Sequence, residues 1–254
     1  KDVAILSEHG CVNRLTGRPI RAVVCMHVFG HPVDISALQE VCNRYRLILI
    51  EDAAESLGSL YKGKAAGSYG AVSALSFNGN KTITTGGGGA VMTNDPALAK
   101  RARHLTTTAK LPHAWEFEHD EIGYNYRMPN LNAAMGIAQL EMLPEFLAQK
   151  RVLKTKYANA FAKLNGLRFI EEPEHSKSNY WLNAILLDQK YAHLRDPILK
   201  ATNDAGLLTR PVWRPMHLLD MFASCPRMDL SVCEKLAARL INLPSNGSLA
   251  DGNT

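Results

Sequence analysis

The stretch from residue 47 to residue 95 constrains the fold of this chain most strongly. It opens with a short apolar run, of the length expected for a strand buried on both faces, and acidic residues that include Asp52 follow at once. A second apolar run, residues 71–77, contains Ser76 and leads through a turn rich in Asn and Gly to Lys81. We therefore expect Asp52, Ser76 and Lys81 in one region, where their side chains can face a ligand.

The residues before this stretch complete a β-α-β unit. Residues 22–26 are predicted to form a strand, Asp34 to cap the helix that follows, and residues 47–50 to form the next strand. Such a crossover is almost always right-handed and joins parallel strands, so His27 and Asp52 are expected at the same carboxyl edge of one sheet. Open α/β sheets bind their ligands at that edge.

The rest of the chain is predicted to mix helices, strands and one long loop. Asp95, with the proline behind it, marks a helix start. Residues 106–128 are rich in His and aromatics but lack periodicity, and we expect them to form a functional loop. A helix is predicted over residues 130–143 and a strand near residues 182–187, whereas residues 55–70 are expected to be irregular.

A second domain is predicted in the last part of the chain. The helix that begins it carries an apolar stripe, which is expected to pack on the core. The residues of this stripe are Phe146, Leu153, Tyr157, Phe161 and Leu164. Further on, Ser231 and Glu234 have the spacing of a capping box at a helix start. We therefore divide the chain into a large domain, residues 1–143, and a smaller α+β domain, residues 144–254.

Composition argues against several classes of function. Positive residues exceed negative ones by five in 254 residues, but no basic stripe interleaved with aromatics is present, so we expect no nucleic-acid partner. The five cysteines are odd in number and form no C-x-x-C pair, which indicates a reducing compartment and no structural zinc, and no other metal-ligand spacing occurs. No apolar run approaches the length of a membrane span and no signal peptide heads the chain, so we expect a cytoplasmic protein without a membrane partner.

Each candidate site residue also has an ordinary structural interpretation. A lysine on a turn is usually a solvated charge, and Lys81 becomes a nucleophile only if partial desolvation lowers its pKa. Asp52 is by default a turn residue and Ser76 a partner of the backbone, although a carboxylate can hold a protonated ring nitrogen and a hydroxyl a phosphate. Glu55, one helical turn beyond Asp52, touches the same ligand or simply lies on the surface. His27 is more often a packed histidine than a catalyst.

The four glycines from Gly86 to Gly89 do not make a nucleotide-binding P-loop. That motif requires a glycine directly before its lysine, where this chain has Asn80. We therefore expect the glycines to form a flexible turn or to let two backbone segments approach closely.

Four motifs give the chain a resemblance to a known family. They are HVFGHPVD at 27–34, IEDAAES at 50–56, SFNGNK at 76–81 and GYNYRMPNLNAAMG at 123–136. With them the chain resembles the DegT/DnrJ/EryC1/StrS family of sugar-nucleotide aminotransferases, and RPVWRPMH at 210–217 looks like the family's C-terminal domain. The resemblance implies an α/β fold: the three-layer large domain of a fold-type-I pyridoxal-phosphate-dependent transferase, with a smaller α+β C-terminal domain.

The resemblance assigns roles to residues in both domains. It implies that Lys81 bonds covalently to pyridoxal 5'-phosphate, that Asp52 pairs with the pyridine nitrogen and that Ser76 is a phosphate ligand. Glu55 stands where many members have glutamine near the ring hydroxyl. Asn125 falls where family dimers send an asparagine to the neighbour's cofactor phosphate, which implies a homodimer with shared active sites. The residues assigned to the substrate are Arg127, His217, Trp213, Arg210 and His27.

The implied reaction is a ping-pong transamination. Glutamate is the expected amino donor, and Lys81 moves a proton between the substrate carbon and the cofactor. Within the family, SFNGNK and the glycines look most like the subgroup that aminates C4 of UDP-linked 4-keto-6-deoxy-N-acetylhexosamines, on routes to legionaminic acid or bacillosamine. Two alternatives stay open: a relative that removes a sugar hydroxyl, whose hallmark is histidine in place of the lysine, and a catalytically inactive fragment that only dimerises or binds nucleotide sugar.

The resemblance also implies that part of the large domain is missing. Family members carry a substantial segment before the HVFGHPVD motif, with a helix start that binds the cofactor phosphate and an aromatic that stacks on its ring. Only a short lead-in precedes the motif here. We therefore expect the N-terminal part of the large domain to be absent from this chain, so that the cofactor pocket lacks a wall.

Overall fold

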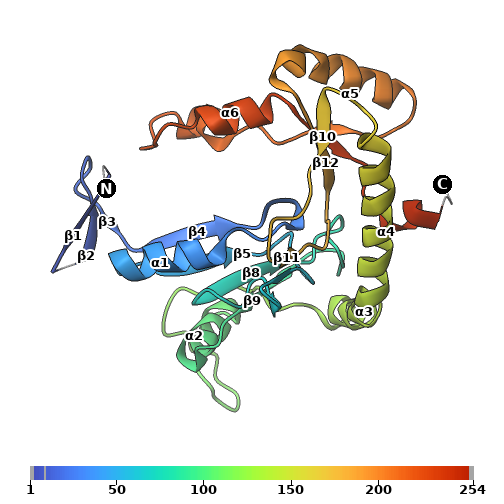
Figure 1. Cartoon of the computed structure of the whole chain (residues 1–254). Coiled ribbons are helices and arrows are strands. Elements are labelled where there is room, and N and C mark those ends of the chain that lie inside the picture. Colours follow the sequence, from blue (N-terminus) through green and yellow to red (C-terminus); the bar gives the residue numbers. More distant parts are fainter. Residues whose placement is uncertain (1–2, 9, 252–254) are drawn as a thin grey trace. The chain divides into compact units, whose positions relative to one another are not determined.

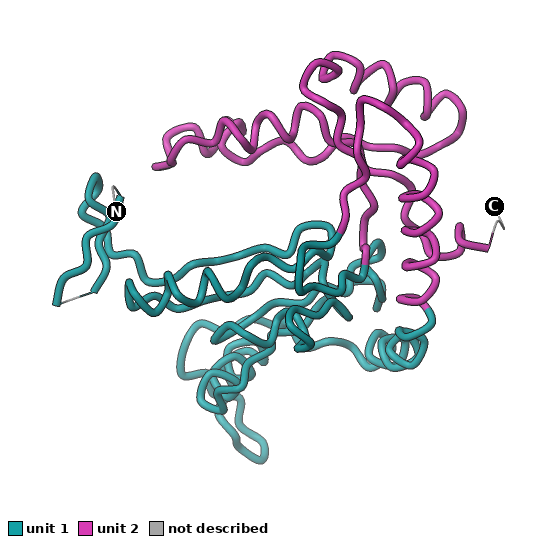
Figure 2. Tube along the Cα trace, viewed as in Figure 1, with its two compact units in different colours: residues 1–145, 172–179 teal, residues 146–171, 180–254 magenta. Residues whose placement is uncertain are grey.

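The computed structural model describes residues 3–8 and 10–251 (Figure 1). By its internal contacts the chain divides into two compact units, which are coloured separately in Figure 2. Unit 1 comprises residues 1–145 and 172–179, and unit 2 comprises residues 146–171 and 180–254. The predicted boundary after residue 143 lies close to the first of these divisions, but the sequence pattern did not predict that residues 172–179 belong to unit 1.

Unit 1 is built around a four-stranded sheet. Its strands, in spatial order, are β4 (Ala22–Met26), β5 (Ile48–Asp52), β8 (Val72–Ser76) and β9 (Gly89–Met92). The first three are parallel and β9 returns antiparallel to β8, which confirms the predicted β-α-β unit. Because Asp52 lies opposite Met26 and Ala74 in register, the carboxyl ends of the three parallel strands lie at one edge.

Helix α1 (Ile35–Tyr45) connects β4 to β5 and covers one face of this sheet (Figure 1). It begins at the predicted cap, because the Asp34 carboxylate accepts a hydrogen bond from the backbone N–H of Ala37 at 3.1 Å. Its apolar residues Ile35 and Cys42 are buried in the core of unit 1. A cap and an apolar stripe at helical spacing are local signals, which explains why the sequence predicted this helix well.

The two faces of the sheet differ in burial. Along β5, Leu49 and Glu51 are buried on the face that α1 covers, whereas Ile48 is 52% exposed. Successive side chains of a strand point to opposite faces, so Asp52 lies on the same side as Ile48. The register of β8 places Ser76 on that side as well. The more open face of the sheet therefore carries two of the predicted site residues at its carboxyl edge.

Two further helices of unit 1 confirm the sequence predictions. Helix α2 (Pro96–Thr106) is capped by Asp95, whose carboxylate accepts a hydrogen bond from the backbone N–H of Ala97 at 2.7 Å. Helix α3 (Asn130–Glu141) follows a long segment that, within the described residues, forms only isolated β-bridges. That segment is the predicted loop.

Two short sheets complete unit 1. One contains β1 (Ala4–Ser7), β2 (Gly10–Asn13) and β3 (Pro19–Ile20), and the other contains β6 (Leu60–Tyr61), β7 (Lys64–Ala65) and β11 (Ser176–Lys177). The prediction that residues 55–70 are irregular was therefore wrong in part, because β6 pairs with a strand from a distant part of the sequence. At Gly89 an added Cβ would collide with the carbonyl oxygen of Leu75, which confirms the predicted close approach of two backbone segments.

Unit 2 combines an antiparallel sheet with helices, and most of α4 belongs to it. Its elements are α4 (Leu143–Phe161), β10 (Leu167–Phe169), β12 (Asn183–Leu187), α5 (Arg195–Asp204), β13 (Arg210–Pro211), α6 (Ser231–Ala237) and β14 (Leu240–Leu243). The sheet order is β10-β12-β14-β13. Strand β12 is buried at every position, and Tyr157 and Phe161 of α4 pack against the cluster formed around Ile185 and Ile241, as the apolar stripe predicted.

Two predictions for unit 2 were wrong. Leu164 lies beyond the end of α4 and is 52% exposed, so it does not extend the apolar stripe. Ser231 and Glu234 do not form a capping box. The Ser231 hydroxyl donates instead to the Asp229 carboxylate at 2.9 Å, and Glu234 lies 2.8 Å from His217. Both side chains bond to partners that the local spacing could not predict.

Short 3-10 helices complete the described chain: η1 (Val28–Gly30), η2 (Gln189–Leu194), η3 (Met216–Leu218), η4 (Asp220–Phe222) and η5 (Gly247–Asp251). In the part of the chain that the structure describes, no helix is long and apolar enough to cross a lipid bilayer.

Candidate active site

The carboxyl edge of the unit 1 sheet presents two polar side chains on one face. Asp52 ends β5, and its carboxylate accepts a hydrogen bond from the backbone N–H of Ala54 at 3.1 Å. Ser76 ends β8, and its hydroxyl oxygen accepts one from the backbone N–H of Asn78 at 3.3 Å. Each side chain is therefore held by the turn that follows its own strand.

The turn after β8 brings Lys81 close to Glu55. The backbone N–H of Lys81 donates to the carbonyl of Asn78 at 3.1 Å, which confirms the predicted turn. The Lys81 amine lies 3.8 Å from a carboxylate oxygen of Glu55, and the two side chains are only 15% and 11% exposed. Lys81 is therefore not the solvated surface charge that its position on a turn would by itself indicate.

Glu55 connects Lys81 electrostatically to Asp52. Burial raises the pKa of the Glu55 carboxyl, and a hydrogen bond at 2.7 Å from the backbone N–H of Phe29 and the charge of Lys81 only partly oppose that rise. The negative charge of Asp52 raises the pKa of Glu55 further. Asp52 and Lys81 therefore both act electrostatically on Glu55, and we call these three residues the group around Lys81.

A buried asparagine holds the segments that carry this group. Asn179 is 1% exposed, and its amide donates to the carbonyls of Glu55 and Leu57 and to the hydroxyl of Thr82, at 2.8, 2.9 and 3.2 Å. It thereby joins the segment of Glu55 to the residue that follows the lysine. A Cβ at Gly30 would collide with the Asn179 side-chain oxygen, and the φ of +88° at this position also requires glycine.

Sequence reasoning missed this buried polar cluster. Asn179 comes from residues 172–179, which belong to unit 1 although they are distant from it in sequence. The hydroxyls of Ser59 and Ser178 also meet there, because both donate to the carbonyl of Gly30, at 2.7 and 2.9 Å. Serine and asparagine in irregular segments have no periodicity, so no sequence signal could have identified them.

His27 lies in the core of unit 1, which corrects its predicted role in substrate binding. The side chain is fully buried, and its Nε2 lies 3.0 Å from the Glu51 carboxylate. Its Nδ1 accepts a hydrogen bond from the backbone N–H of Val33 at 3.3 Å. Glu51 also accepts three hydrogen bonds, of 2.6 to 2.7 Å, from backbone N–H groups of residues 67–70. Both ring nitrogens of His27 are thus used inside the unit, as in the alternative interpretation of a packed histidine.

Asn125 and Arg127 lie in the segment between α2 and α3. Asn125 is exposed, and its backbone forms an isolated bridge with Thr107. Arg127 lines a cavity of about 630 Å³ together with Arg103 and Lys110. The roles of Asn125 and Arg127 at a neighbour's cofactor and at the substrate stay predictions.

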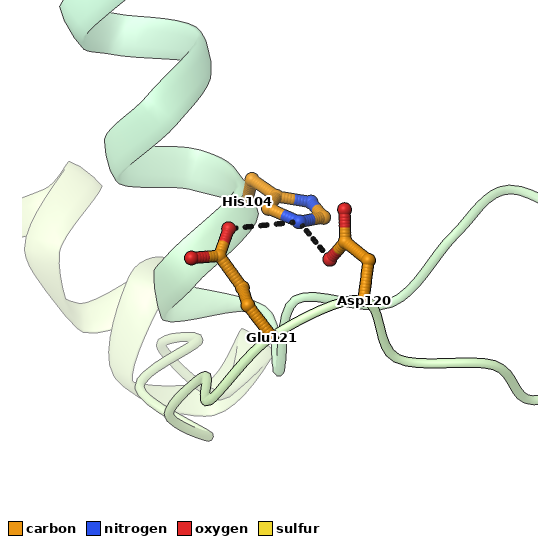
Figure 3. A group of neighbouring side chains, drawn as sticks. All are labelled: His104, Asp120 and Glu121. Carbon is orange, nitrogen blue, oxygen red and sulfur yellow. Dashed lines mark hydrogen bonds and ion pairs between the residues drawn. The ribbon is translucent and has the colours of Figure 1, made fainter.

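Side chains of α2 hold the same segment by ion pairs. His104 places its Nε2 2.7 Å from Asp120 and 3.5 Å from Glu121 (Figure 3). These three residues offer ligand atoms within 4.8 Å of one another, a grouping of metal-ligating residue types that the sequence spacing did not predict. Arg101, however, pairs with both carboxylate oxygens of Glu121. We therefore interpret the group as an ion-pair network and assign no metal to it.

The remaining predicted site residues belong to unit 2. Arg210 donates to a side-chain oxygen of α5 at 2.6 Å, and the Trp213 ring stacks on Trp181 with centroids 6.1 Å apart. His217 places its Nε2 2.8 Å from the carboxylate of Glu234. Each residue therefore has a partner within unit 2, and the roles of all three in sugar-nucleotide binding stay predictions.

The residues at the sheet edge fit pyridoxal phosphate. An amine of low exposure, Lys81, can bond to the cofactor's aldehyde, the carboxylate of Asp52 can pair with a protonated ring nitrogen, and the hydroxyl of Ser76 can bind a phosphate. Asp52 and Ser76 share a face of the sheet. Ser76 also lines a cavity of about 900 Å³ between β8, β9 and α2, which Asp52 and Lys81 do not line. The chemistry of these three side chains at the carboxyl edge of a parallel sheet matches what a pyridoxal-phosphate-dependent transferase requires.

The chain belongs to the DegT/DnrJ/EryC1/StrS aminotransferase family, because the model of that family matches residues 6–254. It is 39% identical over 231 residues to the GDP-perosamine synthase of Escherichia coli O157:H7. The match covers 91% of this chain and 62% of that protein. It is 34% identical over 236 residues to the GDP-perosamine synthase of Caulobacter vibrioides, covering 92% and 63%.

A solved structure shows the same fold. The crystal structure of the aminotransferase TlmJ from Streptoalloteichus hindustanus superposes with a TM-score of 0.86 at 31% identity, over 94% of this chain and 64% of that one. The family match and this superposition confirm the predicted family, the cofactor and the α/β fold class. The chain spans slightly less than two thirds of the length of each of these proteins.

Proposed function

We propose that the protein transfers an amino group to the C4 keto group of a nucleotide-linked 4-keto-6-deoxyhexose, with pyridoxal phosphate as cofactor and glutamate as amino donor. One observation carries this proposal: the Lys81 amine has little exposure and lies 3.8 Å from Glu55, in one electrostatic group with Asp52. The names of relatives, such as the GDP-perosamine synthases, support a nucleotide sugar as the acceptor.

Each residue of the site has a separate task in this reaction. When bound, pyridoxal phosphate supplies an aldehyde that bonds to amines and a ring that accepts the electron pair released at the neighbouring carbon. The Lys81 amine takes a proton from the substrate carbon and returns it, so it must alternate between its charged and neutral forms. Asp52 holds the proton on the ring nitrogen, Ser76 binds the phosphate, and Glu55 fixes the Lys81 amine and faces the ring hydroxyl.

The substrate and a second copy of the chain are assigned further residues. We propose that the protein is a homodimer in which Asn125 reaches the partner's cofactor phosphate, and that Arg127, beside it, lies near the substrate. In unit 2, Arg210, Trp213 and His217 are proposed to contact the sugar nucleotide. The ring of Trp213 is 60% exposed, so a sugar or base could stack on it.

Two nucleotides compete as the carrier of the sugar. The motifs favour a UDP-linked N-acetylhexosamine, on a route to legionaminic acid or bacillosamine. Relatives at 39% and 34% identity are instead named for a GDP-linked sugar. Incubating the protein with glutamate and a panel of UDP-, GDP- and dTDP-linked 4-keto sugars, with mass spectrometry of the products, identifies the carrier and the sugar.

A chemical trap tests the central assignment directly. Protein treated with pyridoxal phosphate and then with borohydride should carry the reduced cofactor on Lys81, detected by mass spectrometry of peptides. Lys81→Arg should abolish this labelling, whereas Lys163→Met, which replaces an exposed lysine of unit 2, should leave it unchanged. Protein whose Lys81 stays unlabelled at saturating cofactor would refute the proposal.

A further inference from the structure

A hollow in unit 1, which we call the basic cavity, lies outside the group around Lys81. It has a volume of about 630 Å³ and is formed by the C-terminal part of α2, the residues that follow that helix, and residues 126–128. Three of its lining residues are cations, Arg103, Lys110 and Arg127, which come from these three different segments. Its size is within the range of cavities that bind small organic ligands.

The three cations have no acidic partner in the described structure. Among the described residues, no carboxylate oxygen lies within 4.0 Å of the charged groups of Arg103, Lys110 or Arg127, and no Asp or Glu lines the cavity. Their neighbours on α2 have acidic partners in the loop. His104 pairs with Asp120 and Glu121 (Figure 3), and Arg101 pairs with Glu121. The helix therefore neutralises the charges on one side and leaves a concentrated positive charge on the other.

A contact with a residue outside the cavity lining restrains part of this charge. The amine of Lys110 lies 3.7 Å from the centroid of the Phe117 ring, a cation–π contact that restrains a flexible side chain. His113 also lines the cavity, but its Nε2 lies 3.7 Å from Glu116, so we do not count it with the three cations. The cavity thus presents a net positive charge to any ligand that enters it.

Three cations that line one cavity indicate the chemistry of its ligand. A neutral sugar needs none of them, and a single carboxylate is satisfied by one arginine. A diphosphate carries several oxygens that accept charge-assisted hydrogen bonds and matches three cations. We propose that the basic cavity binds the diphosphate of the nucleotide-linked substrate, with Arg103 and Lys110 as phosphate ligands in addition to Arg127.

This inference rests on the proposed function, and the position of the cavity supports it. Arg103, Thr106 and Tyr126 line both the basic cavity and the larger cavity on the open face of the sheet, so the two hollows adjoin. Ser76, the proposed ligand of the cofactor phosphate, lines the larger one. A ligand whose diphosphate lies among the three cations would therefore lie next to the hollow that Ser76 lines.

Binding of simple diphosphates tests the cavity without the cofactor. Titration calorimetry with UDP, GDP and inorganic pyrophosphate should show binding by the unmodified protein that weakens as salt is raised. Arg103→Gln and Lys110→Gln should each lower the affinity about ten-fold, since each removes a charge-assisted contact. Arg103→Lys should retain part of the affinity. The matched control is Lys100→Gln, an exposed residue of α2 outside the cavity lining, and it should bind like the unmodified protein.

The outcomes separate this inference from the proposed function. Equal affinities in the unmodified protein, Arg103→Gln and Lys110→Gln, or no binding of any of the three diphosphates, would overturn the inference. If Lys81 is nevertheless labelled by pyridoxal phosphate and borohydride, the proposed function survives that result. If the cavity variants lose affinity while Lys81 remains unlabelled, the diphosphate site stands and the aminotransferase proposal fails.

Discussion

Glu51 and Glu55 are four residues apart in the motif IEDAAES, yet their surroundings move their pKa values in opposite directions. Burial acts to raise both. At Glu51, hydrogen bonds from His27 and from three backbone N–H groups outweigh burial and hold the pKa of the carboxyl below its ordinary value. At Glu55, burial prevails over one backbone N–H and the amine of Lys81, so the pKa is raised. Hydrogen bonds to the charged form decide whether a buried carboxylate is stabilised.

The difference matches the tasks of the two regions. Glu51 holds residues 67–70 in place through backbone hydrogen bonds and also contacts His27. Both oxygens of its carboxylate have hydrogen-bond partners, which suits a permanent structural role. The Glu55 region keeps one carboxylate incompletely compensated beside Lys81 and Asp52. Incompletely compensated charges are typical of sites that await a ligand or move protons.

Lys150 of α4 extends the comparison to a buried cation in unit 2. It is 8% exposed, and its amine donates to the carbonyls of Trp181 and Ser245 at 3.3 and 2.8 Å. These neutral acceptors do not offset desolvation, which lowers the pKa of Lys150 to about 8. The desolvated lysine that sequence reasoning expects of a nucleophile is thus also present in a structural setting, so a lowered pKa alone does not identify a catalytic lysine.

The largest effect is expected for Glu51→Gln. The glutamine side chain keeps the shape of the glutamate, but only one of its two end groups is an oxygen that accepts hydrogen bonds. Its NH2 group would therefore face a backbone N–H that has lost its acceptor. The free energy of unfolding should fall by about 3 kcal/mol or more, as measured by urea denaturation. Glu40→Gln, which changes an exposed residue of α1, is the matched control and should stay within about 0.5 kcal/mol of the unmodified protein.

A pH titration of stability tests Lys150. Its pKa of about 8 in the folded protein lies below the ordinary 10.5, so between these values the unfolded chain binds more protons and stability rises with pH. The full difference corresponds to about 3 kcal/mol. The urea midpoint of the unmodified protein, measured relative to that of Lys150→Met, should therefore rise between pH 8 and pH 10. Parallel pH profiles of the two proteins would show that Lys150 is not desolvated in the folded state.

Local signals in the sequence predicted most of the fold. Strand β4 has the predicted bounds, and Asp34 and Asp95 cap the helices that they were expected to cap. These predictions succeeded because a cap or an apolar run acts over a few residues. The capping box at Ser231 failed because its two members bond to Asp229 and His217, which the local spacing does not include.

The site was less predictable than the fold, for a physical reason. The motifs predicted that Asp52, Ser76 and Lys81 lie near one edge, because strand order and turns follow from the sequence. The structure places Asp52 and Ser76 at that edge and Lys81 in the turn after β8. They could not distinguish which acid of IEDAAES is structural, since that depends on hydrogen bonds from residues 67–70. They also gave no sign of Asn179, whose three hydrogen bonds join segments that are distant in sequence. Tertiary partners, rather than spacing, decide these roles.

Glu55→Gln should give the smallest effect and the opposite sign to Glu51→Gln. Because the folded protein raises the pKa of Glu55, it binds more protons than the unfolded chain just above pH 4.5, and the contribution of Glu55 to stability falls as pH rises through that range. Glutamine removes this cost and still offers an oxygen to the N–H of Phe29, although it loses the attraction to Lys81. At neutral pH the free energy of unfolding of Glu55→Gln should therefore exceed that of the unmodified protein by up to about 1 kcal/mol. This difference should vanish near pH 4. A loss of stability as large as that of Glu51→Gln would mean that both carboxylates are structural, and the distinction between the two regions would fail.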